Sequence, residues 1–164
     1  MGYYVDIEDI SWEMSMVHEE KAFKALCALN HDPDIDKRGR SFSNGEPDKR
    51  WFSWMPEDYD KTTKSVYDIL NMLGFEVEIL PVIEEEVGEL EPWEKGYSPQ
   101  TLYIYSYSSK IGQENLFLQA LAPFVKEGSY IVWRGEHGER WKDAYEDGKM
   151  ITYSARTVWD RPRF

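Results

Sequence analysis

The segment from residue 128 to the end restricts the possible folds of the chain more than any other segment. It contains three runs in which apolar and polar side chains alternate, at 130–134, 139–145 and 150–158. His137-Gly138 separates the first two runs and Asp147-Gly148 separates the last two. Asp-Gly is among the strongest sequence signals for a tight hairpin turn. We therefore expect an antiparallel β-meander at this end of the chain.

The segments before the meander alternate between strand and helix patterns. Strand-like runs occur at 3–7, 51–55, 75–80 and 101–107. Apolar residues at helical spacing occur at 15–30, 58–73 and 112–124. This order predicts an α+β fold in which two to three helices cover one face of a mostly antiparallel sheet. A ferredoxin-like core followed by the meander is the expected architecture.

The length and the aromatic content fit a single domain. A chain of 164 residues with 15% aromatic side chains can bury a substantial core. Two segments interrupt the predicted elements, a polar loop at 31–49 and an acidic insertion at 81–100. We therefore expect one domain over residues 1–164 that contains both segments.

The negative charge of the chain is concentrated in two blocks. The formal net charge is −12, and residues 1–20 contribute −6 while residues 76–97 contribute −7. An acidic surface repels phosphate backbones, so direct binding to nucleic acid or to an anionic membrane is not expected. It favours a basic partner protein, or it serves only to keep the protein soluble. The candidate acidic contacts are Glu84, Glu85, Glu86, Glu89 and Glu91.

Several classes of protein are excluded by the remaining residues. Cys27 is the single cysteine, so neither an intramolecular disulfide nor a cysteine-based zinc site is possible. The aspartates of HDPDID resemble the start of a calcium loop, but Lys37 and Ser43 occupy the positions that need Gly and Glu. The histidines are scattered, and no phosphate-loop motif is present. We expect no metal and no cofactor and, without a signal peptide or an apolar span, a cytoplasmic location.

Tyrosines at alternate positions form the first candidate binding site. Tyr103, Tyr105 and Tyr107 share one face of their predicted strand. Such a row could stack on a nucleotide or pack in a protein interface. Alternatively, the acidic insertion covers it. Lys110 follows in the turn before the next helix, where it could help backbone N–H groups to hold an anion.

The stretch GSYIVWRGEHGERW, residues 128–141, gathers acids, a histidine and two arginines. Its alternation makes it a hairpin, and a histidine at an exposed turn is poorly placed for acid–base catalysis. Arg134 is expected to pair across strands with Glu139 or Asp143. Arg134 and Arg140 are candidate anion contacts because they are basic residues in an acidic protein.

Three stretches resemble a group of small uncharacterised proteins of bacteriophages and bacteria. They are the start GYYVDI, the segment RWFSWMP, and KIGQENLFLQALAPFVKEGSYIVWRGEHGERW. The general layout is also similar to that of YubB-type ferredoxin-like proteins, in topology only. Neither resemblance implies an activity or catalytic residues. The first implies a phage or mobile-element accessory protein in the cytoplasm of the host cell.

Two functions follow as expectations. The first is a non-enzymatic phage-type accessory protein whose acidic surface and aromatic patches bind a basic host protein. A host-defence factor that it blocks by mimicking nucleic acid is one such partner. The alternative is a small-molecule-binding protein, in which the tyrosine row stacks on a nucleotide and Lys110, Arg134 or Arg140 contacts its phosphate. No constellation of catalytic residues supports an enzyme.

Overall fold

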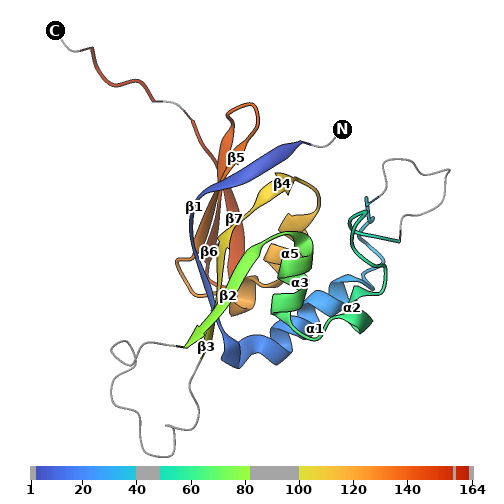
Figure 1. Ribbon diagram of the computed structural model, residues 1–164. Helices are drawn as coiled ribbons and strands as arrows, with labels where there is room; N and C mark the ends of the chain where they lie inside the picture. The colour runs from blue at the N-terminus through green and yellow to red at the C-terminus, as the bar shows by residue number, and fades with distance from the viewer. Residues whose placement is uncertain (1–2, 40–48, 82–99, 157, 163–164) are drawn as a thin grey trace, which may run out of the picture.

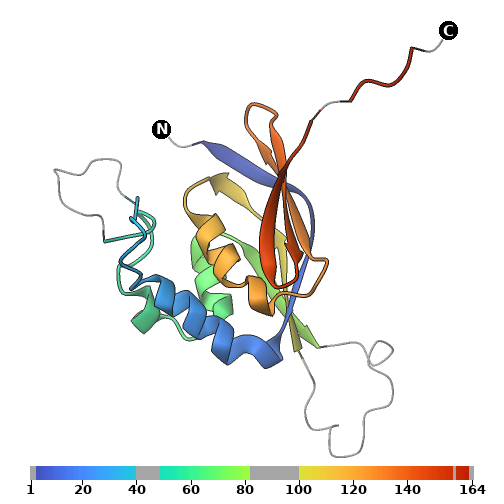
Figure 2. The same cartoon turned by 180° about the vertical axis from the view of Figure 1, so that it is seen from behind.

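The computed structural model describes residues 3–39, 49–81, 100–156 and 158–162. Its strands form one antiparallel sheet, and its helices lie together on one face of that sheet (Figures 1 and 2). The strands are β1 (Tyr4–Ser15), β2 (Glu76–Pro81), β3 (Gln100–Ser106), β4 (Ser108–Lys110), β5 (Tyr130–Gly135), β6 (Arg140–Glu146) and β7 (Lys149–Ser154). The helices are α1 (Glu19–Leu29), α2 (Tyr59–Thr62), α3 (Val66–Leu73) and α5 (Glu114–Ala120), with short 3-10 turns η1 (Met16–His18) and η2 (Ala122–Phe124). The α+β class expected from the sequence is confirmed.

The strand order in the sheet is β2-β3-β1-β5-β6-β7, and β4 pairs with β1 beyond the end of β3. The chain passes through β1, α1, β2, β3, α5 and β5 in the β-α-β-β-α-β order of a ferredoxin-like core. β6 and β7 then extend the sheet as consecutive hairpins, which is the predicted meander. At the second turn Asp147 and Gly148 have φ values of 53° and 73°, as a type I′ turn requires.

β1 is a long strand with a bulge in its middle. It runs over twelve residues, whereas the sequence predicted a strand only at 3–7. Its register against β5 shifts between Ile7 and Asp9, and the extra residue there is Glu8. On the other edge of β1, beside the bulge, the paired strand changes from β4 to β3 at Tyr107. The carbonyl oxygen of Tyr107 accepts a hydrogen bond from the Ile7 N–H at 3.1 Å. In β1, and in the β3–β4 segment paired with it, the alternation of side chains between the two faces of the sheet shifts by one residue at this point.

Two helices replace the single helix predicted at 58–73. α2 ends where Thr63 becomes extended and its hydroxyl donates to the carbonyl oxygen of Tyr59 at 2.6 Å. α3 begins after Ser65, whose hydroxyl accepts a backbone N–H of the first turn at 3.1 Å, and it ends at Gly74 with φ of 109°. Its buried stripe consists of Val66, Ile69, Leu70 and Leu73.

The segment 51–55, predicted as a strand, is a series of turns. Trp51, Phe52 and Met55 are nevertheless buried. Trp51 lies edge-on to Phe117 of α5, with ring centroids 5.7 Å apart. The aromatic residues that suggested a strand are therefore core residues of a turn.

The core lies between the helices and the sheet, and large aromatic side chains fill much of it. Those that are fully buried are Trp12, Trp51, Tyr59, Phe75, Tyr107, Phe117 and Tyr145. The opposite face of the sheet is covered by none of the helices of the described residues (Figure 1). We call this the open face. Residues 82–99 of the acidic insertion, with the five candidate glutamates, and residues 40–48 of the polar loop lie outside the described residues.

Candidate functional site

Tyr103 and Tyr105 lie on the open face of the sheet, in β3. Their rings stack with centroids 6.1 Å apart and planes 29° apart. The Tyr105 residue is 45% exposed, whereas Leu102 and Ile104, which alternate with the tyrosines, are buried against the core. The predicted alternation is therefore correct for these two tyrosines.

Tyr107 does not belong to this row, although the sequence predicted that it would. It is 2% exposed, and its hydroxyl donates to Glu114 Oε1 at 2.5 Å. The same hydroxyl lies 3.1 Å from the carbonyl oxygen of Lys110. The reason is the break between β3 and β4, which shifts the alternation by one residue and turns the Tyr107 ring into the core.

Two carboxylates flank the tyrosine pair. Glu78 of β2 and Glu13 of β1 are the register partners of Tyr103 on its two sides. Glu78 is exposed, whereas Glu13 is half-buried and forms an ion pair with Lys126 Nζ at 2.8 Å. Desolvation and then the negative charge of Glu78 raise the pKa of Tyr105. We call Tyr103, Tyr105, Glu13 and Glu78 the tyrosine patch.

In the turn after β4, the lysine and one backbone donor of the expected anion site contact groups of the chain itself. Lys110 Nζ lies over the ring of Tyr4, 5.8 Å from its centroid. The backbone N–H of Gly112, at the entry to α5, donates to Glu114 Oε2 at 2.6 Å. The chain's own carboxylate therefore occupies the donor that an external anion would need.

Arg134 and Arg140 bind acidic residues of β1. Asp6 lies 2.9 Å from Arg134 Nη2, and Glu8 lies 2.6 Å from Arg140 Nε. Asp6 is also the register partner of Arg134 across β1 and β5. The pairs predicted for Arg134, with Glu139 or Asp143, are therefore wrong.

The residues expected to hold a nucleotide do not converge. Lys110 is at Tyr4, and the two arginines are paired near the start of β1, while the tyrosine pair faces the end of that strand. The stacking surface and the expected phosphate contacts are thus separated along the sheet. This arrangement gives the nucleotide hypothesis no geometric support.

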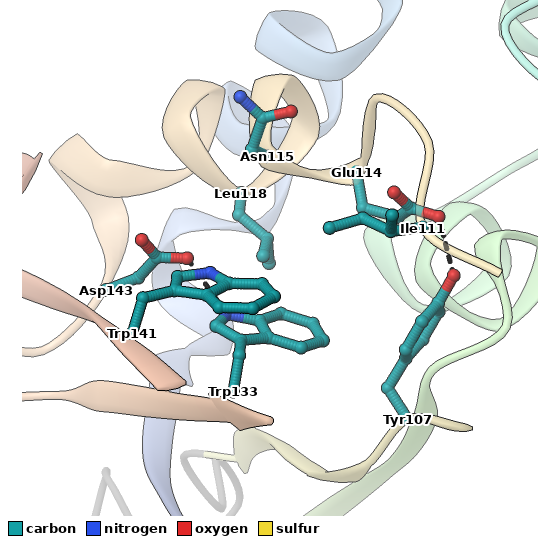
Figure 3. Close-up of a pocket in the computed structure, with 8 residues that line it drawn as sticks. All are labelled: Tyr107, Ile111, Glu114, Asn115, Leu118, Trp133, Trp141 and Asp143. Atoms are coloured by element: carbon teal, nitrogen blue, oxygen red, sulfur yellow. Dashed lines mark hydrogen bonds between the residues drawn. The ribbon is translucent and has the colours of Figure 1, made fainter. Parts of the chain in front are cut away.

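A small pocket opens between α5 and the sheet (Figure 3). It is lined by Tyr107, Ile111, Glu114, Asn115, Leu118, Trp133, Trp141 and Asp143. Its volume is about 30 Å³, which gives room for about two water molecules. Trp133 and Trp141 are register partners on β5 and β6, and their rings stack with centroids 6.2 Å apart and planes 16° apart. Trp133 is buried, but Trp141 is half-buried beside the exposed Ile111 and Asn115, which border the opening.

Two carboxyl groups are buried in the walls of this pocket. Glu114 and Asp143 are only 3% and 4% exposed. Glu114 accepts the two hydrogen bonds described above. Asp143 accepts one from Trp133 Nε1–H at 2.9 Å and one from the Thr152 hydroxyl at 2.6 Å. Desolvation raises the pKa of both carboxyl groups, and these hydrogen bonds offset only part of that effect.

Neither carboxyl group was predicted as part of a site, although the sequence pattern marks Asp143 as unusual. Alternation places Asp143 on the same face of β6 as Trp141 and Tyr145, so it is a carboxylate within an apolar stripe. Glu114 stands in the first turn of α5. Acidic residues are common there and usually exposed, so the local sequence does not mark its burial.

A second polar cluster joins the end of α1 to α2. His31 Nε2 lies 2.7 Å from Asp60 Oδ2, and the Asn30 side-chain amide donates to Asp60 Oδ1 at 2.7 Å. Desolvation raises the pKa of Asp60, but the hydrogen bonds from His31 and Asn30 outweigh it and lower the pKa overall. Lys37 Nζ completes the cluster by donating to Asn30 Oδ1 at 2.7 Å. These contacts hold the two helices together.

The described residues contain no group of three or more His, Cys, Asp and Glu that could hold a metal ion. In the part of HDPDID that resembled a calcium loop, Asp32 Oδ1 accepts the backbone N–H of Asp34 at 2.9 Å. This contact forms an Asx turn.

Comparison with known proteins finds no family model, no curated protein and no solved structure that matches this chain. Within the described residues, no helix has both the length and the apolar character needed to span a membrane.

Proposed function

We propose that this protein is a non-enzymatic binding protein whose tyrosine patch contacts a basic partner protein. The observation that supports this most is the stacked pair of Tyr103 and Tyr105 between Glu78 and Glu13 on the open face. Exposed rings beside negative charge favour the guanidinium and ammonium groups of Arg and Lys. The net charge of −12 adds attraction at longer range.

The open face already contains such a contact within the chain. Lys142 Nζ lies 4.9 Å from the ring centroid of Tyr130, and the Tyr130 hydroxyl donates to Asp9 at 3.2 Å. A cation, a ring and a carboxylate thus lie side by side on β6, β5 and β1. Tyr105 and Glu78 repeat the ring and the carboxylate on β3 and β2, and a basic side chain of the partner would supply the cation.

The acidic insertion is connected to the strands that carry the patch. It leaves β2 at Pro81 and returns to β3 at Gln100, and these two residues are register partners at the end of the hairpin. In the sequence, its glutamates therefore lie directly between the strand of Glu78 and the strand of Tyr103. The resemblance to phage-borne proteins points to a host protein as the partner. A defence factor with a nucleic-acid-binding surface has the basic charge that this arrangement complements.

Titration with an arginine-rich peptide tests the proposal, with NMR chemical shifts as the readout. We expect the largest shifts at Tyr103 and Tyr105 and an affinity that falls steeply as salt is added. Tyr105→Thr keeps a β-forming residue but removes the ring, and Glu78→Gln removes the charge. Each should weaken binding about fivefold, because each deletes one part of the cation contact.

Tyr153→Thr is the matched control for Tyr105→Thr. Tyr153 lies on β7 at the far edge of the sheet, is 47% exposed, similar to Tyr105, and its hydroxyl also donates to a carboxylate, Glu146 Oε2, at 3.0 Å, so the two variants differ in their position on the sheet. Its replacement should leave peptide affinity unchanged, and a partner captured from a host extract should follow the same pattern. Equal losses for the two tyrosine variants, or binding that does not respond to salt, would refute the tyrosine patch as the contact.

A further inference from the structure

The segment that follows β7 carries exposed apolar side chains outside the folded body. The last backbone hydrogen bond from its described residues to the sheet runs from the Ala155 N–H to the carbonyl oxygen of Arg140, at 3.1 Å. From there the segment extends away from the sheet (Figures 1 and 2). Val158 and Trp159 are 73% and 88% exposed, the largest values among the large apolar residues that the structure describes. We call residues 155–164 the C-terminal segment.

The C-terminal segment is basic, unlike the rest of the chain. It contains three arginines and one aspartate, a net charge of +2, which leaves −14 for residues 1–154. Arg156 and Arg161 take part in none of the ion pairs between described residues, and Trp159 takes part in none of their ring contacts. Tryptophan and arginine are enriched among the residues that dominate binding at protein interfaces. The segment therefore presents two kinds of anchor residue that the described part of its own chain does not engage.

The tyrosine patch has the complementary chemistry. The stacked rings of Tyr103 and Tyr105 offer a surface on which an indole ring can pack, and Glu78 is exposed beside them. Arginine side chains bind both aromatic faces and carboxylates. The opposite charges of the segment and of the rest of the chain add attraction at longer range.

Trp159 cannot reach the tyrosine patch of its own chain. Ser154, at the end of β7, lies in the same row across the sheet as Ile7 of β1. Tyr103 is paired with Glu13, further along β1. Because β7 runs opposite in direction to β1, the chain leaves β7 moving away from the patch. A reversal takes a turn of about four residues, and strand spacing and rise place Tyr103 about 25 Å from Ser154, so the chain up to Trp159 is too short.

We propose that the C-terminal segment of one molecule binds the tyrosine patch of a second copy, with Trp159 against the tyrosine rings and the arginines beside the carboxylates of the patch. The inference rests on the proposed function in that it uses the same patch, and it names a second copy as a basic partner. A reciprocal exchange of segments closes a two-fold dimer. This contact competes with any other basic protein for the patch.

Sedimentation velocity of the full chain over a range of concentrations tests the contact. We expect the wild type to self-associate at low salt, and Trp159→Ala and Tyr105→Thr each to weaken self-association about tenfold, because each deletes an aromatic anchor. Tyr153→Thr should self-associate like the wild type. A wild type that stays monomeric at every concentration, or an equal loss caused by Tyr153→Thr, would overturn the proposal.

A mixture of the two weakened variants is the sharper test. The Tyr105→Thr chain keeps an intact segment, and the Trp159→Ala chain keeps an intact patch. An equimolar mixture should therefore form a mixed complex at a concentration where neither variant associates alone, and a fluorescent label on one variant detects it. Absence of this complex would refute the contact between segment and patch.

The arginine-rich peptide separates failure of this contact from failure of the proposed function. The peptide should bind the Trp159→Ala protein at Tyr103 and Tyr105, and more tightly than it binds the wild type at concentrations where the wild type is associated. If the peptide binds there but the mixed complex is absent, only the contact between two copies is refuted. If neither the peptide nor a second copy shifts the signals of Tyr103 and Tyr105, both proposals fall.

Discussion

At the scale of single residues, Glu114 links the pocket to the stability of the fold. Its carboxyl group is 3% exposed, and burial raises its pKa above the ordinary value of 4.5. A carboxyl group with a raised pKa stabilises the fold at low pH, and that contribution is lost as pH rises through the pKa of the folded protein. Each pH unit by which the pKa is raised corresponds to about 1.4 kcal/mol.

Glu114→Gln should therefore change how stability depends on pH. The variant stays neutral, so the wild type should lose free energy of unfolding relative to it as pH rises from about 4 to about 8. Urea denaturation of both proteins across this range measures the difference. Glu76→Gln, at an exposed position of β2, controls for the loss of one negative charge. A wild-type advantage that grows with pH would mean that the hydrogen bonds from Tyr107 and Gly112 outweigh burial.

Individual residues also show where sequence reasoning fails. The alternation rule placed Tyr103 and Tyr105 correctly because β3 is regular up to Ser106. It failed at Tyr107, where pairing passes to β4 opposite the bulge at Glu8 of the partner strand. Because the shift in alternation is caused by a bulge in another strand, far away in the sequence, the residues around Tyr107 do not reveal it.

At the scale of elements, α3 shows how local signals define a helix that tertiary contacts then bury. Ser65 caps it, Gly74 ends it, and the four residues of its buried stripe, Val66, Ile69, Leu70 and Leu73, are fully buried. In addition, Glu19 of α1 accepts the Val66 N–H at 2.8 Å, so a neighbouring helix satisfies one of the free donors at this terminus.

Ser65→Ala should destabilise the protein by about 1 kcal/mol, because the hydroxyl that accepts a first-turn N–H is lost. Ser15→Ala is the comparison. Ser15 caps the three-residue turn η1 through a longer contact of 3.4 Å, so its effect should be much smaller. Thermal and chemical denaturation measure both. Equal effects of the two substitutions would show that the Ser65 cap contributes little to the stability of α3.

Elements bounded by clear turn or helix-capping residues were predictable, and elements without such residues were not. The hairpin turns of the meander and the end of α3 carry glycines with positive φ and were placed correctly. β1 was predicted too short because acidic residues and a bulge interrupt its apolar pattern around Glu8. The turn at 51–55 was mistaken for a strand because burial in a turn and burial in a sheet select the same aromatic residues.

At the scale of the whole molecule, the architecture was predicted correctly although the strand expected at 51–55 is absent and the helix expected at 58–73 is divided into α2 and α3. Short connections and antiparallel pairing leave few arrangements for a β-α-β-β-α-β chain, and the ferredoxin-like one places its helices on one face. Both candidate sites result from that layering. The open face leaves Tyr103 and Tyr105 accessible, and the helix-covered face brings Glu114 of α5 and Trp133 of β5 into the wall of one pocket.

The acidic insertion can be removed by mutagenesis, so that its contribution to binding is measured separately from that of the folded sheet. Pro81 and Gln100 are register partners, so a short Gly-rich turn in place of residues 82–99 should close the β2–β3 hairpin without strain. The core residues that the structure describes are all retained, and the replacement should leave the melting temperature unchanged or raise it.

The same replacement removes six glutamates and Lys95, which changes the net charge from −12 to −7. Binding of the arginine-rich peptide should become weaker and less dependent on salt, because the long-range attraction is reduced. The further loss caused by Tyr105→Thr should persist in the shortened protein, since the patch itself is intact. If shortening alone abolishes binding and Tyr105→Thr then has no effect, the insertion rather than the tyrosine patch holds the partner.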